Sequence, residues 1–483
     1  MAEVAPNPFD VLPIETNQHI ASYLDNELDL GRFRLICHST HDAVDADRCS
    51  FWRRRFLTTF ERPTWTGGNN ERYKTTYQKR KRALMFGAKF EVAINKSGKD
   101  VGKQITKSIQ ALEALRDLIV DSFSGKKASA DGEAYESPNV DYILRFIVNQ
   151  DLLQVVFLPE RRGSKDVHCM PKQLLHTIQV MLAPAMLSLK HKHLLQSHFG
   201  YPQSQYTAYG TAVEHPIFGG CNNLDINMEW VLHHLNFWKY HMVRKDEQTL
   251  YEPFKELHDD ETPRFWNDQL KTGGNKLGTH WKGCYAYVER EVILDIRAGR
   301  GQDGMIQDEF NGEADAGSFQ DMRLEFIEDG EEGWPKLFEQ HLHSLTAPAS
   351  RAKTRAQHRS ATPEGIVAFK PQNFQFAGEG HDATEDFCAQ GWLNALPPQQ
   401  GIPGWQRMTM MKYFEDPDTH EIDREALWAY EGVVLPGGQI MLGRWWSPGD
   451  GTGSEMYSGP FILWCVDGPR YAESDPDEGD ALP

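Results

Sequence analysis

The stretch LPIETNQHIASYLDNELDLGRFRLICH, residues 12–38, decides how the N-terminal part of this chain folds. Pro13 predicts the start of a helix, because the first helical turn leaves unpaired the N–H that proline lacks. Apolar residues then recur at the spacing of one face of a short amphipathic helix, at Ile20, Tyr23 and Leu24. The polar pair Asp25 and Asn26 ends that pattern.

Two further helix starts follow in the same region. Asn26 with Asp29 resembles a capping box, and Ser39 with Asp42 is a second start signal. Apolar residues after the first start fall at i, i+3 and i+7, namely Leu30, Phe33 and Cys37. Three helices this short bury little surface, so the module of residues 7–60 is expected to be marginal alone and to need a partner.

The module resembles an F-box, with the pattern Leu12-Pro13-x-Glu15-x4-Ile20-x2-Tyr23-Leu24-x5-Leu30-x2-Phe33-Arg34-x2-Cys37-His38, followed by the aromatic pair Phe51-Trp52. In that family the helices bind the small acidic Skp-type adaptor of cullin-RING ubiquitin ligases, and the rest of the chain selects substrates. The resemblance implies adaptor contacts at Leu12, Pro13, Glu15, Ile20, Tyr23, Leu24, Leu30, Phe33 and Cys37. Thr16 departs from the family, which usually has an aliphatic residue there. The alternative is an unrelated helical cap whose apolar face meets its own core.

Composition bounds the rest of the molecule. With 483 residues, 40% apolar and 11% aromatic, the chain can bury a large core and is expected to hold two or three domains. It has no run of about 18 apolar residues and no signal pattern, so we expect neither a membrane span nor secretion. The net charge of −18 argues against nucleic acid as a partner of the whole molecule.

The cysteines and histidines predict neither disulfides nor a metal site. The seven cysteines occur singly, without a CxxC pair, at positions 37, 49, 169, 221, 284, 388 and 465. Such a set is typical of free thiols in a reducing compartment, so we expect the cytoplasm, the nucleus or both. The histidine groups at 191–198 and 233–241 lack an HExxH arrangement, so we expect no metal and no cofactor.

Basic residues concentrate in one segment. Residues 48–90 hold twelve Lys or Arg against only Glu61 and Glu71. One interpretation is a solvated helix face whose buried side is formed by Tyr73, Tyr77 and Leu84. The alternatives are a cationic surface that meets an acidic adaptor or cullin, and a segment for nuclear import or phosphate binding.

Residues 61–261 are predicted to be mainly helical. Apolar residues advance by three and four along one long helix, at Ile105, Ile109, Leu112, Leu115, Ile119 and Phe123. A polar loop follows at 124–138. No fixed-period repeat is visible, so we interpret this region as a helical spacer between the docking module and a C-terminal binding domain.

The hydrophobic period changes in residues 273–467. Trp281 and Tyr285 alternate with Lys282 and Cys284, which is typical of a strand. Further strands are predicted at 322–326, 406–414, 427–434, 439–446 and 461–466.

A turn with a clear physical basis joins two of these strands. In Leu435-Pro436-Gly437-Gly438, proline fixes φ at the second position and glycine accepts a positive φ at the third, so 427–446 is predicted to be a hairpin. Many short, aromatic-rich strands favour a sheet that closes on itself and thereby has no edges. The sequence thus predicts an α+β chain: a three-helix N-terminal module, a helical middle region and a C-terminal antiparallel, calycin-like β-barrel.

This C-terminal part carries a second resemblance. Its WKGxY strand, acidic insertion, Gly391-Trp392 pair, WAYEGVVLPGGQIMLGRWW hairpin and GPFILW strand resemble the C-terminal half of fungal F-box proteins, and more loosely the barrel of the cyclin D-degrading F-box protein of animals. In that family the barrel carries the surface that binds a substrate's degradation signal. Residues 311–359 look like an insertion, and the acidic tail 468–483 is expected to be disordered.

Candidate substrate-binding residues come from the predicted strands. A site for a peptide needs aromatic walls and a few placed donors, and such groups occur at Trp281, Lys282, Tyr285, Trp428, Tyr430, Arg444 and Trp446. If Arg444 points into a mostly apolar interior, it needs a carboxylate from Glu431 or from a ligand. The alternatives are a structural pair with Glu431, or an arginine on the exterior.

The chain contains no recognised catalytic motif. GxSxG and GxxxxGK[ST] are absent, and the GxGxxG match at 299–304 neither follows a βαβ unit nor opens an apolar helix. We therefore predict a non-catalytic substrate receptor, which holds a Skp-type adaptor and through it a cullin-RING complex, and presents a protein substrate for ubiquitination and proteasomal degradation. The alternatives are a lipocalin-like barrel that binds a small ligand, with an F-box role outside ubiquitination, and a hydrolase with an unrecognised site.

Overall fold

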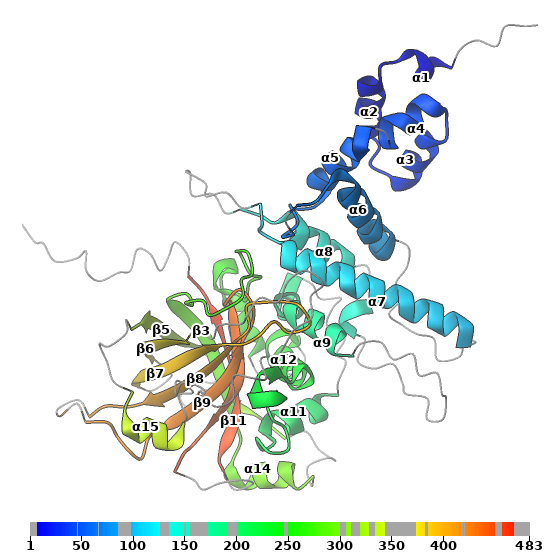
Figure 1. The fold of residues 1–483 in the computed structure, drawn as a ribbon. Coiled ribbons are helices and arrows are strands. Elements are labelled where there is room, and N and C mark those ends of the chain that lie inside the picture. Colours follow the sequence, from blue (N-terminus) through cyan, green and yellow to red (C-terminus); the bar gives the residue numbers. More distant parts are fainter. Residues whose placement is uncertain are drawn as a thin grey trace, which may run out of the picture. The chain divides into compact units, whose positions relative to one another are not determined.

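The computed structural model describes residues 7–45, 47–65, 67–85, 98–125, 135–148, 151–154, 172–190, 200–245, 250–299, 306–310, 319–327, 334–342, 373–381, 385–416, 419, 421–449 and 456–467. The chain forms two compact units, one mainly Met1–Gln150 and the other mainly Pro171–Trp266 and Leu270–Pro483. The first unit is helical, and the second combines helices with a β-barrel (Figure 1). The predicted tail 468–483 and the predicted histidine group 191–198 lie outside the described residues.

The first unit consists of α1 (Pro8–Val11), α2 (Ile14–Ser22), α3 (Glu27–Arg34), α4 (His38–Asp45), η1 (Asp47–Cys49), α5 (Ser50–Thr59), α6 (Asn70–Met85), α7 (Gly98–Asp121) and α8 (Pro138–Val148). The predicted cap of α3 is confirmed, because the side chain of Asn26 accepts a hydrogen bond from the N–H of Leu28 at 2.9 Å. Asp29 instead accepts a hydrogen bond from Arg32 at 3.0 Å. Helix α4 begins just before Ser39, whose hydroxyl donates to Asp10 at 2.7 Å.

The N-terminal helices have a core of their own. Its fully buried members include Ala21, Leu30, Phe33, Ala43, Val44, Phe51 and Trp52. The core continues into α6, where the ring centroids of Trp52 and Tyr77 lie 5.7 Å apart. The predicted buried side of α6 is confirmed at Tyr73, Tyr77 and Leu84.

The second unit contains a closed antiparallel barrel of eight strands: β3 (His280–Tyr287), β5 (Gln320–Phe326), β6 (Asn373–His381), β7 (Asp386–Ala395), β8 (Gln406–Tyr413), β9 (Trp428–Val434), β10 (Ile440–Trp446) and β11 (Ser458–Cys465). Each strand pairs with its neighbour in this order, and β11 pairs with β3 to close the sheet. The short strand β4 (Glu309–Phe310) adds to the end of β3. The predicted barrel is thereby confirmed.

The hairpin predicted at 427–446 is also confirmed, as strands β9 and β10. The N–H of Leu435 donates to the carbonyl of Ile440 at 2.9 Å across the turn. Gly437 has a φ of 90° and Gly438 a φ of 67°, a region that favours glycine. Strands β6 and β7 were not predicted; glycines such as Gly378 occupy some of their inward positions and interrupt the apolar alternation, although Phe376 and Leu393 also face inward.

Helices pack on the outside of this barrel. They are α9 (Lys172–Met181), α10 (Ala183–Met186), α11 (Tyr201–Tyr209), α12 (Met228–Val243), α13 (Tyr251–Glu256), α14 (Arg290–Arg297) and α15 (Lys336–His341), together with the two-residue strands β1 (Phe218–Gly219) and β2 (Asp225–Ile226). Helix α12 contacts α9, α11 and β10, and 15 of its 16 residues are buried. The region 61–261 that the sequence predicts as one spacer is thus divided, because its later helices belong to the barrel unit.

Candidate functional site

Exposed apolar side chains concentrate on the first helices. Eleven large hydrophobic residues are exposed in the described part of the chain, and seven of them lie in the span of residues 11–36: Val11, Leu12, Ile14, Tyr23, Leu28, Leu35 and Ile36. Leu35 is 85% exposed and Tyr23 is 72% exposed, although both follow directly on helices whose inner residues are buried. So many exposed apolar residues in one segment make it a candidate interaction site.

The structure divides the residues that the sequence predicts as adaptor contacts. Leu12, Pro13, Glu15 and Tyr23 are exposed, Ile20, Leu24 and Cys37 are half-buried, and Leu30 and Phe33 lie in the core. Leu30 and Phe33 therefore hold the helices together and are not at the surface. Leu28, Leu35 and Ile36 are exposed and were missed, because they fall outside the apolar stripe of α3.

Local hydrogen bonds position these surface residues. The amide of Asn17 donates to the carbonyl of Phe9 at 3.0 Å and so ties α2 to α1. Asp10 of α1 accepts from Ser39 of α4, and hydrogen bonds from Ser39 and Cys37 lower the pKa of Asp10. The short helix α1 is thereby attached to two longer ones.

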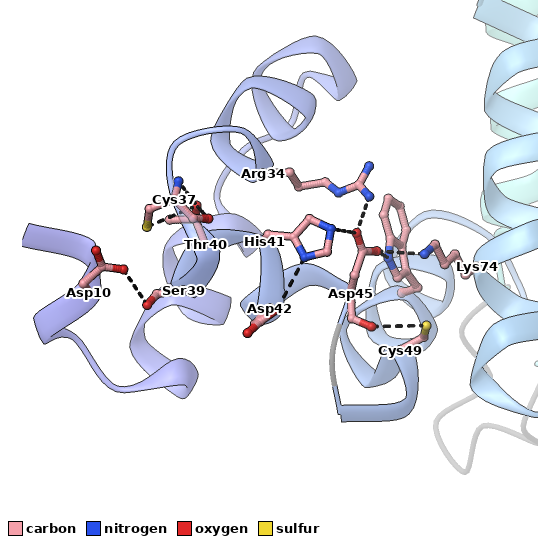
Figure 2. A network of polar contacts seen from close by, with 11 residues as sticks. Asp10, Arg34, Cys37, Ser39, Thr40, His41, Asp42, Asp45, Cys49 and Lys74 are labelled. Atoms are coloured by element: carbon pink, nitrogen blue, oxygen red, sulfur yellow. Dashed lines mark hydrogen bonds and ion pairs between the residues drawn. The ribbon is translucent and has the colours of Figure 1, made fainter. Parts of the chain in front are cut away.

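Asp45, the last residue of α4, links four helices. Its carboxylate accepts hydrogen bonds from Trp52 Nε1 at 2.9 Å and pairs with Lys74 Nζ at 2.8 Å and with Arg34 (Figure 2). Burial by itself raises the pKa of Asp45, but the hydrogen bonds from Lys74, Trp52 and Arg34 outweigh burial, so the pKa is lowered. The carboxylate stays charged at neutral pH and joins α3, α4, α5 and α6.

In the barrel, the predicted substrate-binding residues fall on two opposite faces. Trp281, Tyr285, Trp428 and Tyr430 belong to the cluster inside the barrel. Lys282, Arg444 and Trp446 take the alternate positions and face outward, so the seven residues do not line one site. Lys282 pairs there with Asp321, with 2.7 Å between Nζ and Oδ1.

Arg444 is outside the barrel but buried. Its Nη2 donates to the carbonyl of His215 at 3.0 Å, and its guanidinium lies 5.8 Å from the ring centroid of Trp230 in α12. Glu431 is its neighbour across the β-ladder, but the carboxylate of Glu431 pairs with Arg407. Burial lowers the pKa of Arg444 to about 10. Of the two orientations that the sequence leaves open for Arg444, the structure shows the exterior one, because strand alternation directs its side chain to the helices.

An aromatic cluster occupies the end of the barrel at which β3 finishes. The ring of Trp445 lies within 6.0 Å of the rings of Tyr285, Trp428 and Tyr457, measured between centroids. These three rings are half-buried. We call Tyr285, Trp428, Trp445 and Tyr457 the aromatic end cluster.

Lys412 is the residue beside this cluster that sequence reasoning missed. Its side chain is buried, with Nζ 4.1 Å from the ring centroid of Phe387 and 5.3 Å from that of Tyr285. A signal was present, because Lys412 follows Met408 and Met410 at the inward positions of β8. Its Nζ also lies 5.5 Å from the ring centroid of Phe414, so aromatic rings surround this cation.

Comparison of the chain with protein-family models, with curated proteins and with solved structures found no match. Within the described ranges, no helix is long and apolar enough to cross a membrane. Nor do those ranges contain three or more His, Cys, Asp or Glu side chains grouped so that they could hold a metal ion. The candidate functional features are the exposed apolar residues of 11–36 and the aromatic end cluster.

Proposed function

We propose that this chain is the non-catalytic substrate-recognition subunit of an SCF-type ubiquitin ligase. In this proposal the N-terminal helices bind a Skp-type adaptor, and the barrel binds the degradation signal of a protein substrate. The subunit then contributes proximity, because it raises the effective concentration of one substrate near the ubiquitin carrier.

One observation carries the proposal. Helices α1 to α4 have a buried core, yet seven large hydrophobic residues between Val11 and Ile36 stay exposed. A helical cap that merely covered its own core would bury such residues, since burying a Leu or Ile side chain contributes about 1.5–3 kcal/mol. Their exposure supports a docking role and agrees with the F-box pattern in the sequence.

The adaptor half is tested by binding of a purified Skp-type adaptor to the full chain. We expect Leu35→Ser combined with Ile36→Ser to weaken binding about tenfold or more, because two apolar contacts are lost. Val213→Ser is the matched control, since Val213 is also 85% exposed but lies in the barrel unit. If the wild-type chain retains no adaptor, the proposal is wrong.

The barrel half assigns substrate binding to the aromatic end cluster with Lys412. Tryptophan and tyrosine are among the residues on which binding energy most often concentrates. We expect Trp428→Ala to reduce substrate capture from cells with blocked degradation while adaptor affinity stays unchanged. An equal loss of substrate capture and of adaptor affinity would indicate unfolding and contradict this assignment.

The lipocalin-like alternative receives less support. Seventeen buried residues, among them Trp281, Phe376 and Phe461, pack together inside the barrel. An eight-stranded barrel is just wide enough for side chains to fill its interior. This packing favours binding at an end of the barrel over binding of a ligand within it.

A further inference from the structure

A pocket of about 380 Å³ lies between α3 and α6 in the first unit. Helix α3 contributes Glu27, Leu30, Gly31 and Arg34, helix α5 contributes Trp52, and helix α6 contributes Lys74, Tyr77, Gln78, Lys81 and Arg82. We call it the α3–α6 pocket. Four cationic side chains and one carboxylate line it, which gives a lining charge of +3.

The two nearby carboxylates are already engaged. Glu27 pairs with Arg55 at 3.2 Å and accepts a hydrogen bond from the hydroxyl of Tyr77. The carboxylate of Asp45 forms ion pairs with both Arg34 and Lys74. Among the described residues, neither Lys81 nor Arg82 has a carboxylate within ion-pair distance; Lys81 Nζ lies 5.8 Å from the ring centroid of Tyr77 and 5.2 Å from that of Tyr142.

Two further observations concern the cations that line the pocket. The Nε of Arg34 is buried and has no hydrogen-bond partner among the described residues, although such donors are rarely left unpaired. Burial lowers the pKa of Lys81; the charge of Glu27 opposes this effect, and that of Arg55 adds to it. An anion in the pocket would favour the charged form of Lys81 and so oppose that shift.

We propose that the α3–α6 pocket binds a small molecule that carries two or more phosphate groups. Two phosphate groups carry a charge of about −3 to −4 near neutral pH, which matches the charge of the lining. Arginine and lysine are the residues that bind phosphate oxygens. Nucleic acid fits less well, because the rings of Trp52 and Tyr77 are buried and offer no face for a base to stack on.

Gly31 supports a pocket that is kept open. It lies inside α3, where glycine costs roughly 1 kcal/mol relative to alanine. A Cβ at this position would meet no atom within 4 Å, so packing does not require glycine there. The missing side chain leaves space for a ligand.

The test is calorimetric titration of the full chain with pyrophosphate and, separately, with inositol hexakisphosphate at low ionic strength. We expect saturable binding of one molecule of at least one probe, weakened by added salt. Lys81→Met is expected to reduce the affinity roughly tenfold, because a charge-assisted contact is lost. The control is Lys79→Met, since Lys79 is exposed on the same helix and pairs with Glu113 at 3.3 Å; it is expected to bind as the wild type does.

A second pair of variants guards against unfolding. Gly31→Glu places a carboxylate at the pocket, and Gly31→Gln places a neutral group of the same size. We expect the first to reduce binding more than the second. No saturable binding of either probe, tighter binding of a hexaglutamate peptide, or equal affinity of Lys81→Met and Lys79→Met would overturn the proposal. Because no adaptor is present, the result is independent of the ligase proposal.

Discussion

Two neighbouring histidines of α12, His233 and His234, are buried in the second unit. His233 is buried, and its Nδ1 lies 3.2 Å from the hydroxyl of Ser204. His234 stacks on Trp230, with ring centroids 3.4 Å apart, and its Nδ1 donates to the Trp230 carbonyl at 3.0 Å. Burial lowers the pKa of both imidazoles, to about 4 for His233. Both rings are therefore neutral in the folded chain at physiological pH.

At this scale we predict a loss of stability in mild acid. The pKa of His233 in the folded chain lies below its unfolded value of 6.5, so the unfolded state binds more protons. The contribution of neutral His233 to the free energy of unfolding is therefore complete above pH 6.5 and is lost as pH falls toward 4. Between pH 8 and pH 5 the loss from His233 is about 2 kcal/mol. Urea unfolding at both pH values checks this.

His233→Asn removes the titrating ring, so its unfolding free energy should vary less with pH than that of the wild type. His19→Asn is the control, because His19 is exposed in the first unit. An unchanged pH dependence in His233→Asn would refute the explanation.

At the level of elements, the barrel depends on close approach of its strands. Gly432 of β9 and Gly443 of β10 are directly opposed. A Cβ at Gly443 would overlap the carbonyl oxygen of Glu431 and meet the ring of Phe461, a core residue, at 2.7 Å. Glycine is needed there because backbone atoms of the neighbouring strand and an aromatic ring of the core fill the space that a side chain would occupy.

We predict that Gly443→Ala destabilises the barrel unit by about 3 kcal/mol, because the added methyl group forces backbone and core side chains apart. Chemical denaturation followed by tryptophan fluorescence measures this effect. Gly449→Ala is the matched control, since a Cβ there would meet nothing within 4 Å. Similar midpoints for the two variants would show that the strands adjust more easily than the contacts indicate.

For the whole molecule, the division into two compact units predicts separate unfolding. Each unit has its own core, and Asp45 links helices of the first unit only. We expect two calorimetric transitions. Asp45→Asn should reduce the free energy of unfolding of the first unit by about 2 kcal/mol, because charged hydrogen bonds are lost. Its transition then moves to lower temperature, and the transition of the second unit stays in place.

Asp42→Asn is the control for that experiment, because the side chain of Asp42 is 59% exposed. Its carboxylate lies 3.4 Å from Nδ1 of the exposed His41. A single transition that moves as a whole would contradict independent units. The same melting curves report whether variants used in the binding experiments remain folded.

Local patterns in the sequence determined the helix starts and the hairpin. Asn26 caps α3 because its side chain reaches an N–H two residues away, and Gly437 turns the chain because its own φ is positive. These features depend on neighbours along the chain, so spacing and residue type are sufficient to predict them. Strands β6 and β7 were not predicted, because glycines at some of their inward positions interrupt the hydrophobic alternation to which Phe376 and Leu393 belong.

Only the tertiary structure decided which side of each element is used. The pairing of β11 with β3 closes the barrel and places Arg444 outside it and Lys412 inside it. In the N-terminal helices, packing buries Leu30 and leaves Leu35 exposed, although both are leucines of the same region. The physical reason is that burial and charge compensation depend on contacts with residues distant in sequence. The local hydrophobic periodicity of a segment does not indicate which distant residues will contact it.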